Sequence, residues 1–383
     1  MKKQNFITRP ISAYYLLLAS TAGLTGLGII MVLSASSIHS LETNGSSFAI
    51  FFKQLFFLSI ALPLGYVASR LPLIRWRNLA KFALIITVAI LFIVQIPRVG
   101  QNVGGNVNWI GVGPFTIQPS EFGKFLMCLW AGYMIANREN SRTSQKNLML
   151  LISPGFAGVA LLILKGRDLG TTCVYAAIFV GVLFIAGISM RFIAATSAGA
   201  VAAVLGLILT APARADRLKA VFKPFAPEYY KLAGWQPAHS IMGLASGGFF
   251  GVGLGASRQK WGNLAEAHTD FIISVIGEEL GLLGTLTVIV LLGILIISIF
   301  RIALRAQDTM VRYTCAGIGC AIAAQSILNI GTATSVLPVV GVTLPLLSYG
   351  GSSLIATYLS LGFVLGAARR DPEIASVLKK DKP

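Results

Sequence analysis

The chain has 383 residues, of which 55% are hydrophobic and only 12% are charged, and its formal net charge at pH 7 is +17. Soluble domains average about 25% charged residues, so this composition excludes a purely soluble protein and indicates an integral membrane protein. The polar stretches hold no recognised nucleic-acid-binding motif and no platform of aromatic and basic residues, so nothing in the sequence supports nucleic acid as a partner, and none is expected. The excess of basic residues is therefore attributed first to the topology of the chain in the membrane.

Apolar runs of about 17 to 25 residues recur along the chain, each long enough to cross a hydrocarbon layer of about 30 Å as a helix. The predicted transmembrane helices cover residues 12–34, 48–69, 82–97, 119–137, 148–164, 171–188, 193–211, 271–300, 313–333 and 349–368. We therefore expect an all-α polytopic membrane protein with ten transmembrane helices in a single domain over residues 1–383. The bundle would occupy residues 12–370, followed by a tail at 371–383. The first run follows Lys3 as in a signal peptide, but its length of about 22 residues favours a retained anchor.

The positions of lysine and arginine set the expected orientation. With the N-terminus in the cytoplasm, every short loop on the inner side is basic, and most of the 31 basic residues lie on that side. They include Lys2, Lys3, Arg142 and Lys382. This distribution follows the positive-inside rule, so we expect both termini and the tail in the cytoplasm.

One long segment, residues 212–270, is expected outside the membrane between the seventh and eighth helices. Its seven basic residues are Arg214, Arg217, Lys219, Lys223, Lys231, Arg258 and Lys260. They belong either to a solvated loop or to a site that binds an anion at the membrane surface. The stretch 239–264 mixes glycines with large apolar residues, which favours a membrane-hugging or re-entrant element over a disordered loop.

Acidic and basic residues also stand at the outer ends of several predicted helices. Asp270 precedes the eighth helix, where it either caps the helix or faces a cavity. Glu278 would lie about 12 Å deeper on the same helix, too far to form a catalytic carboxylate pair with Asp270. Glu121 and Lys124 are spaced i, i+3, so they form either a structural ion pair or a cavity site for an anion. Asp168 is likewise either a cap or a cavity residue.

Five motifs carry a resemblance to a known family. They are "NWIGVGPFTIQPSEFGKF", "DLGTT", "ASGGFFGVGLGASRQKW", "EAHTDFIISVIGEELGLLG" and "GVTLPLLSYGGSS". In this order and spacing, over residues 12–370, the chain resembles the SEDS family (shape, elongation, division and sporulation). The resemblance implies a ten-helix enzyme that polymerises lipid II, an undecaprenyl-pyrophosphate-linked disaccharide-pentapeptide, into glycan strands at the outer face of the bacterial cytoplasmic membrane. "EAHTDF" together with "GASRQKW" favours the division branch, and hence the septum, over the elongation branch.

The resemblance also implies roles for residues. Asp270 matches the family's essential carboxylate, and we expect it to act as general base or to orient the acceptor hydroxyl. Glu121 and Lys124 match its cavity residues, and Asp168 matches the aspartate of its "DLGT" motif. The other expected substrate-binding residues are Trp109, Arg258, Lys260, Ser348, Gly350 and Gly351.

Transfer of a sugar from an α-linked pyrophosphate with inversion needs a base at the acceptor, whereas the leaving group needs charge stabilisation more than a proton. Lys124 and the outer basic residues are expected to supply that charge, with Mg²⁺ or Mn²⁺ as an additional candidate whose ligands the sequence does not identify. No organic cofactor is expected. The sequence departs from the family at Asn106 and Asn108, where many relatives have an arginine pair, at Arg167 in "RDLGT", and at His239.

Three alternatives stay open. A lipid II flippase would share the cavity but would need alternating access rather than a base, and an elongation-type polymerase would share the chemistry. A secondary transporter of small solutes is the alternative that does not depend on the family resemblance. The expected partners are lipid II, the membrane, a class B penicillin-binding protein of the FtsI type that supplies the crosslinking transpeptidase, and other division proteins. Glu278 and Glu279 are expected to be structural, and His268 and Glu266 to position the loop.

Overall fold

The computed structural model describes residues 9–103, 105–113, 115–139, 145–210 and 212–380. Of the basic residues used for the topology, Lys2, Lys3, Arg142 and Lys382 lie outside these ranges. The longer helices are α1 (Pro10–Asn44), α2 (Ala49–Arg70), α3 (Leu73–Val94), α4 (Pro119–Glu139), α5 (Gln145–Lys165), α6 (Leu169–Ile185), α7 (Met190–Leu209), α11 (Ile272–Arg305), α12 (Thr309–Ala333) and α13 (Gly351–Arg370). The shorter helices are α8 (Pro212–Phe222), α9 (Pro227–Tyr230), α10 (Trp235–Ser246) and α14 (Pro372–Lys380).

Each of the ten segments predicted to span the membrane is helical. Eight helices in the described part of the chain, α1, α2, α3, α5, α7, α11, α12 and α13, are long and apolar enough to cross a membrane, and α6 is a shorter apolar helix. The chain is therefore a multi-pass membrane protein. Two predicted bounds are wrong by more than two turns: α1 ends at Asn44 instead of residue 34, and α3 begins at Leu73 after Pro72 instead of at residue 82. The first turns of α3 carry Arg75 and Arg77, and these charges interrupt the apolar pattern although the backbone is already helical.

The expectation of an all-α chain is corrected by a small antiparallel sheet where a loop was expected. Strands β1 (Gly100–Val103), β2 (Asn106–Val112) and β3 (Phe115–Ile117) pair in the order β1-β2-β3. The turn between β1 and β2 contains Gly105 with φ 88°, a backbone conformation that favours glycine. A short β-meander is difficult to detect inside a chain whose dominant pattern is a series of apolar helices.

The helices pack most closely where small residues face one another. A Cβ atom on Gly362 of α13 would lie 2.3 Å from the carbonyl oxygen of Gly65 on α2, so only glycine permits this approach. Helix α12 lies inside the bundle and packs against α4, α6 and α11. Together with α13 it is the most buried of the candidate spanning helices.

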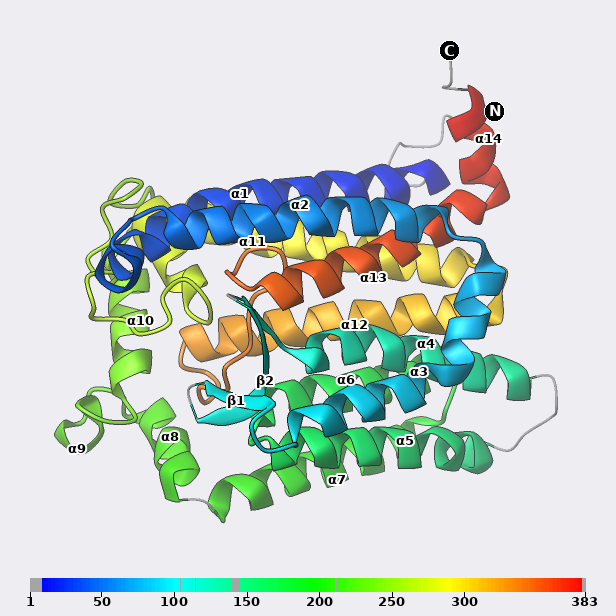
Figure 1. The fold of residues 1–383 in the computed structure, drawn as a ribbon, viewed down its shortest axis with the longest axis horizontal. Coiled ribbons are helices and arrows are strands. Elements are labelled where there is room, and N and C mark those ends of the chain that lie inside the picture. The colour runs from blue at the N-terminus through cyan, green and yellow to red at the C-terminus, as the bar shows by residue number, and fades with distance from the viewer. Residues whose placement is uncertain (1–8, 104, 114, 140–144, 211, 381–383) are drawn as a thin grey trace.

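Figure 1 shows different elements at the two ends of the helical bundle. The start of α1, the end of α13, α14 and the α2–α3 and α11–α12 connections lie at one end, and the sheet, α8, α9 and α10 lie at the other. At the first end Arg77 pairs with Asp308, and Arg305 Nε lies 2.8 Å from Asp371 Oδ2. The segments that the sequence assigned to the outer side therefore gather at one end of the molecule.

Candidate functional site

Asp270 lies in the loop directly before α11. The helix begins at Ile272 with Phe271 at its N-cap, and no side chain caps it there, so the interpretation of Asp270 as a helix cap is wrong. The Asp270 side chain is partly buried. No donor among the described residues lies within hydrogen-bonding distance of its carboxylate. The carboxylate is therefore free to interact with a bound molecule.

The backbone that carries Asp270 is fixed by the connection between α12 and α13. The carbonyl of His268 accepts a hydrogen bond from Tyr349 N at 2.9 Å, and the carbonyl of Thr269 accepts one from Ser348 Oγ at 2.6 Å. Ser348 Oγ also accepts a hydrogen bond from Leu344 N at 2.9 Å. Ser348 was predicted to bind substrate, and the structure places its hydroxyl in the support of the Asp270 loop.

The electrostatic surroundings of Asp270 disfavour its charged form. Burial, with smaller contributions from the negative charges of Glu266 and Asp168, raises the pKa of Asp270 to about 7. Burial also lowers the pKa of the nearby His268 to about 4, and His39, whose ring stacks on that of His268, adds to this effect. Near neutral pH the loop thus holds a carboxyl group close to its titration point beside a neutral imidazole.

Asp168 is the N-cap of α6 and is nearly fully buried. Its Oδ1 accepts a hydrogen bond from Thr171 N at 2.8 Å, and its Oδ2 accepts from Thr171 Oγ1 at 2.7 Å and from Gln118 Nε2 at 3.2 Å. Burial raises the pKa of Asp168, and the hydrogen bonds from Thr171 oppose this. The cap interpretation is therefore confirmed for this aspartate.

One short segment connects the Asp168 cap to Asp270. A Cβ atom on Gly170 would lie 2.3 Å from the carbonyl oxygen of Val340, so the start of α6 touches the α12–α13 connection. A Cβ atom on the next residue of that connection, Gly341, would lie 3.6 Å from Asp270 Oδ2. Residues 340–341 thus lie against both the start of α6 and the Asp270 carboxylate, and they form part of the wall of the Asp270 site.

Glu121 and Lys124 form a buried ion pair on α4. Their Oε2 and Nζ atoms are 2.7 Å apart, and both side chains are 8% exposed. The pair lines a small cavity of about 20 Å³, together with Gln325 of α12 and Thr357 and Ser360 of α13. The interpretation as an ion pair is confirmed, and the pair also faces a cavity. Binding of an anion there stays a prediction. The Lys124 charge is compensated by Glu121 in this conformation.

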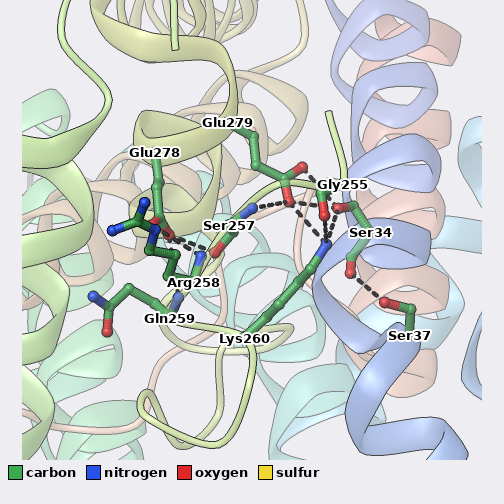
Figure 2. A network of polar contacts seen from close by, with 9 residues as sticks. All are labelled: Ser34, Ser37, Gly255, Ser257, Arg258, Gln259, Lys260, Glu278 and Glu279. Carbon is green, nitrogen blue, oxygen red and sulfur yellow. Dashed lines mark hydrogen bonds and ion pairs between the residues drawn. The ribbon is translucent and has the colours of Figure 1, made fainter. Parts of the chain in front are cut away.

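Glu278 and Glu279 hold the loop that precedes Asp270 onto α11, as Figure 2 shows. Glu278 Oε2 accepts from Ser257 Oγ at 2.5 Å and its Oε1 accepts from Arg258 N at 3.0 Å. Glu279 Oε1 lies 3.2 Å from Lys260 Nζ, and the carboxylate also accepts from Ser34 Oγ of α1 at 2.7 Å. Both glutamates are buried and belong to the internal support of the loop.

This network corrects the prediction for Lys260. Its side chain is 4% exposed, and its Nζ donates to Gly255 O at 2.6 Å and to Ser34 Oγ at 3.2 Å in addition to pairing with Glu279. The ammonium group is therefore committed to partners inside the protein. Arg258, by contrast, is exposed, and only its backbone N joins the network.

The glycine-rich stretch predicted to hug or re-enter the membrane docks into a break in α11. At Gly281 the backbone has φ 68° and ψ -162°, which interrupts the helix. The carbonyls of Glu278 and Glu279 accept hydrogen bonds from Val252 N at 2.9 Å and Gly253 N at 3.1 Å. The loop thereby satisfies backbone groups that the break would leave unpaired.

The remaining predicted residues lie on neighbouring elements. Trp109 is partly buried in β2, where it pairs with Gln101 of β1. Gly350 N donates to Gln54 Oε1 of α2 at 3.3 Å. A Cβ atom on Gly351 would lie 2.5 Å from the ring of Phe57, so this glycine permits close packing of α13 on α2. These glycines shape the turn and its packing.

Comparison with known proteins decides the family. Residues 15–372 match the family model for FtsW, RodA and SpoVE, described as "Cell cycle protein". The chain belongs to the SEDS family. It is 35% identical to the probable peptidoglycan glycosyltransferase FtsW of Mycobacterium tuberculosis over 98% of this chain and 71% of that protein. It is 38% identical to the protein of the same name from Tolumonas auensis, covering 91% of this chain and 90% of that protein, and 34% identical to stage V sporulation protein E of Bacillus subtilis, covering 94% and 98%.

Solved SEDS structures share the fold. One, from a study of how a peptidoglycan synthase complex coordinates polymerisation and crosslinking, has a TM-score of 0.76 and 26% identity, covering 94% of this chain and 98% of that chain. The rod shape determining protein RodA of Thermus thermophilus has a TM-score of 0.69 and 26% identity, covering 93% and 96%. The curated relatives named above are FtsW and stage V sporulation proteins, whereas RodA appears among the solved structures.

Sequence reasoning about this SEDS protein missed two amide side chains at the site. Gln118 donates to Asp168, and Asn329 of α12 donates to the carbonyl oxygen of Asp270 at 2.7 Å. An amide inside an apolar helix is the signal that could have identified Asn329, because such residues usually face the interior of a bundle.

A resident metal ion would need several acidic, imidazole or thiolate ligands close together. Among the residues that the structure describes, no group of three or more His, Cys, Asp and Glu side chains lies close enough to hold a metal ion. The expectation of a Mg²⁺ or Mn²⁺ ion stays a prediction.

Proposed function

We propose that this SEDS protein is a peptidoglycan glycosyltransferase of the division type, which polymerises lipid II into glycan strands for the septal cell wall. The activity named for its curated relatives supports this assignment over nearly the whole length of the chain. The single observation that carries the mechanism is the free carboxylate of Asp270, with a pKa of about 7, on a loop anchored to α11, α12 and the segment before α13.

In the proposed reaction Asp270 accepts the proton of the acceptor 4-hydroxyl while that oxygen attacks the anomeric carbon of the donor sugar. A new glycosidic bond forms with inversion, and the bond from the anomeric carbon to the pyrophosphate oxygen breaks with its electron pair. The leaving group departs as lipid-linked pyrophosphate and needs positive charge rather than a proton. The exposed side chain of Arg258 is the candidate nearest in sequence for that charge, and Lys124 could contribute only by exchanging its partner Glu121.

The proposed topology has ten transmembrane helices, α1 to α7 and α11 to α13, with both termini in the cytoplasm. The separation of the two ends in Figure 1 supports it, because the start of α1, the end of α13 and the basic α2–α3 and α11–α12 turns share one end of the bundle. The Asp270 loop then lies at the outer face. The solved complex that couples polymerisation to crosslinking supports a class B penicillin-binding protein of the FtsI type as partner, and we place this pair at the septum with other division proteins.

The activity is tested by incubating the purified chain with lipid II in liposomes, with and without a class B penicillin-binding protein, and resolving glycan strands on a gel. We expect polymer from the wild-type protein, with a higher rate when the partner is present. A flippase would instead move lipid II between leaflets without making polymer. Lipid II scrambling without any glycan strands, in the presence of the partner, would contradict the proposed function.

The rate of polymerisation is expected to rise with pH through about 7, the pKa of Asp270. Only the ionised carboxylate accepts a proton, so below the pKa the rate should fall by about tenfold per pH unit. Initial rates of strand synthesis measured from about pH 5.5 to pH 9 test this, because that window brackets the titration of the proposed base. A flat profile between pH 6 and pH 8 would argue against Asp270 as the base.

A further inference from the structure

The side chain of Asn329 makes two hydrogen bonds that meet at the Asp270 site. Asn329 lies in the last turns of α12 and is 1% exposed. Its Nδ2 donates to the carbonyl oxygen of Asp270 and to the carbonyl oxygen of Val342, both at 2.7 Å. One amide group therefore connects the residue that carries the carboxylate to the segment that forms the wall beside it.

The direction of this amide is fixed by its surroundings. A flipped side chain would place Oδ1 against two carbonyl oxygens, and acceptors facing acceptors repel each other. In the observed direction Oδ1 is buried and has no hydrogen-bond partner among the described residues. A buried acceptor without a partner is unfavourable. The two hydrogen bonds donated by Nδ2 offset this cost and account for an asparagine at this position.

These bonds complete a set of three anchors on consecutive carbonyls. His268 O and Thr269 O accept from Tyr349 N and Ser348 Oγ, which belong to the segment that follows Val342. Asn329 supplies the third anchor, and it is the one on Asp270 itself. It is also the only one of the three that comes from a regular helix.

We propose that Asn329 is a positioning residue for Asp270 in glycosyl transfer. By holding the Asp270 and Val342 carbonyls together, it sets the distance between the carboxylate and the wall at Gly341, where the acceptor hydroxyl must approach. A shift of about 1 Å in a catalytic group can lower a rate by about 10²-fold. This inference rests on the proposed function, because it concerns the geometry of the proposed base.

Two variants separate positioning from general stability. Asn329→Ala removes both hydrogen bonds, and Asn329→Asp keeps the size and shape of the side chain but replaces the donor with an oxygen. The control is Ser326→Ala, one turn earlier on α12, where a buried hydroxyl donates only to Ile322 O of its own helix. All three are assayed for strand synthesis in liposomes as full-length proteins, with thermal unfolding measured alongside.

For Asn329→Ala we expect kcat to fall by about 10²-fold with little change in KM, whereas Ser326→Ala should stay within about twofold of wild type. For Asn329→Asp we also expect the midpoint of the pH–rate profile to move upward, because a second carboxylate next to Asp270 disfavours its ionisation. Glu266 on the same loop and Asp168 at α6, the other charged groups that act on Asp270, are unchanged in all variants.

The outcomes distinguish a failure of the proposed function from a failure of the role proposed for Asn329. A wild-type protein that makes no polymer with its partner present would overturn the function itself. If the wild type is active but a folded Asn329 variant has the same kcat as Ser326→Ala, only the proposed role of Asn329 would be overturned. If Asn329→Ala does not fold, Asn329→Asp decides through its kcat at little-changed KM, because it preserves the packing volume while removing the two hydrogen bonds from Nδ2.

Discussion

Replacing Asp270 with asparagine is expected to lower the rate of glycan polymerisation by about 10²- to 10⁴-fold, the usual contribution of a general base. Asparagine has nearly the same shape but cannot accept the proton of the acceptor hydroxyl. Binding of lipid II should change little, because the leaving-group end of the substrate is held by other residues. Strand synthesis from lipid II by the purified variant with its partner measures the effect.

The stability of this variant provides the control for folding. The pKa of Asp270 is raised from 3.8 to about 7 in the folded protein, so its protonated form stabilises the fold fully below pH 3.8 and this contribution is lost as the pH rises through about 7. At pH 8 the neutral Asp270→Asn protein should therefore unfold at a temperature no lower than wild type. Asp216→Asn, which changes an exposed carboxylate on α8, should keep full activity. A fully active Asp270→Asn protein would contradict the mechanism.

Replacing Lys260 with methionine is expected to destabilise the protein by about 3 to 5 kcal/mol, the usual consequence of leaving a buried charge without its partner. Glu279 is 0% exposed and would lose the ammonium group that pairs with it, keeping Ser34 and Ser257 N as donors. The loop that leads to Asp270 should loosen at the same time, so activity should fall too. Thermal unfolding in detergent measures the first effect and strand synthesis the second.

The matched control is Lys219→Met on α8. Lys219 pairs with Asp216 at 3.5 Å with both side chains more than half exposed, and such surface pairs contribute about 0 to 1 kcal/mol. The double variant Lys260→Met with Glu279→Gln removes the buried charge as well and should recover much of the lost stability. If Lys260→Met unfolded no more easily than Lys219→Met, the buried pair would not support the loop as proposed.

The sequence by itself was sufficient for the membrane-spanning framework. Long apolar runs identify helices because a membrane leaves the backbone no partner outside the helix, and this rule depends only on local composition. The motif around Asp270 and the family followed from residue order alone. Asp168 was also within reach, since an aspartate followed by a leucine and small residues at the start of an apolar run is typical of an N-cap.

The tertiary structure alone decided what the polar residues contact. Lys260 resembled a rim residue for an anion, yet its partners Glu279 and Ser34 come from two different helices, and Ser34 lies at the other end of the sequence. The link from Asn329 to Asp270 O depends on how α12 packs against the start of α11. Local pattern predicts how a segment folds, but hydrogen bonds between segments form only where packing brings distant backbones together, and these bonds determine which charge stays free for chemistry.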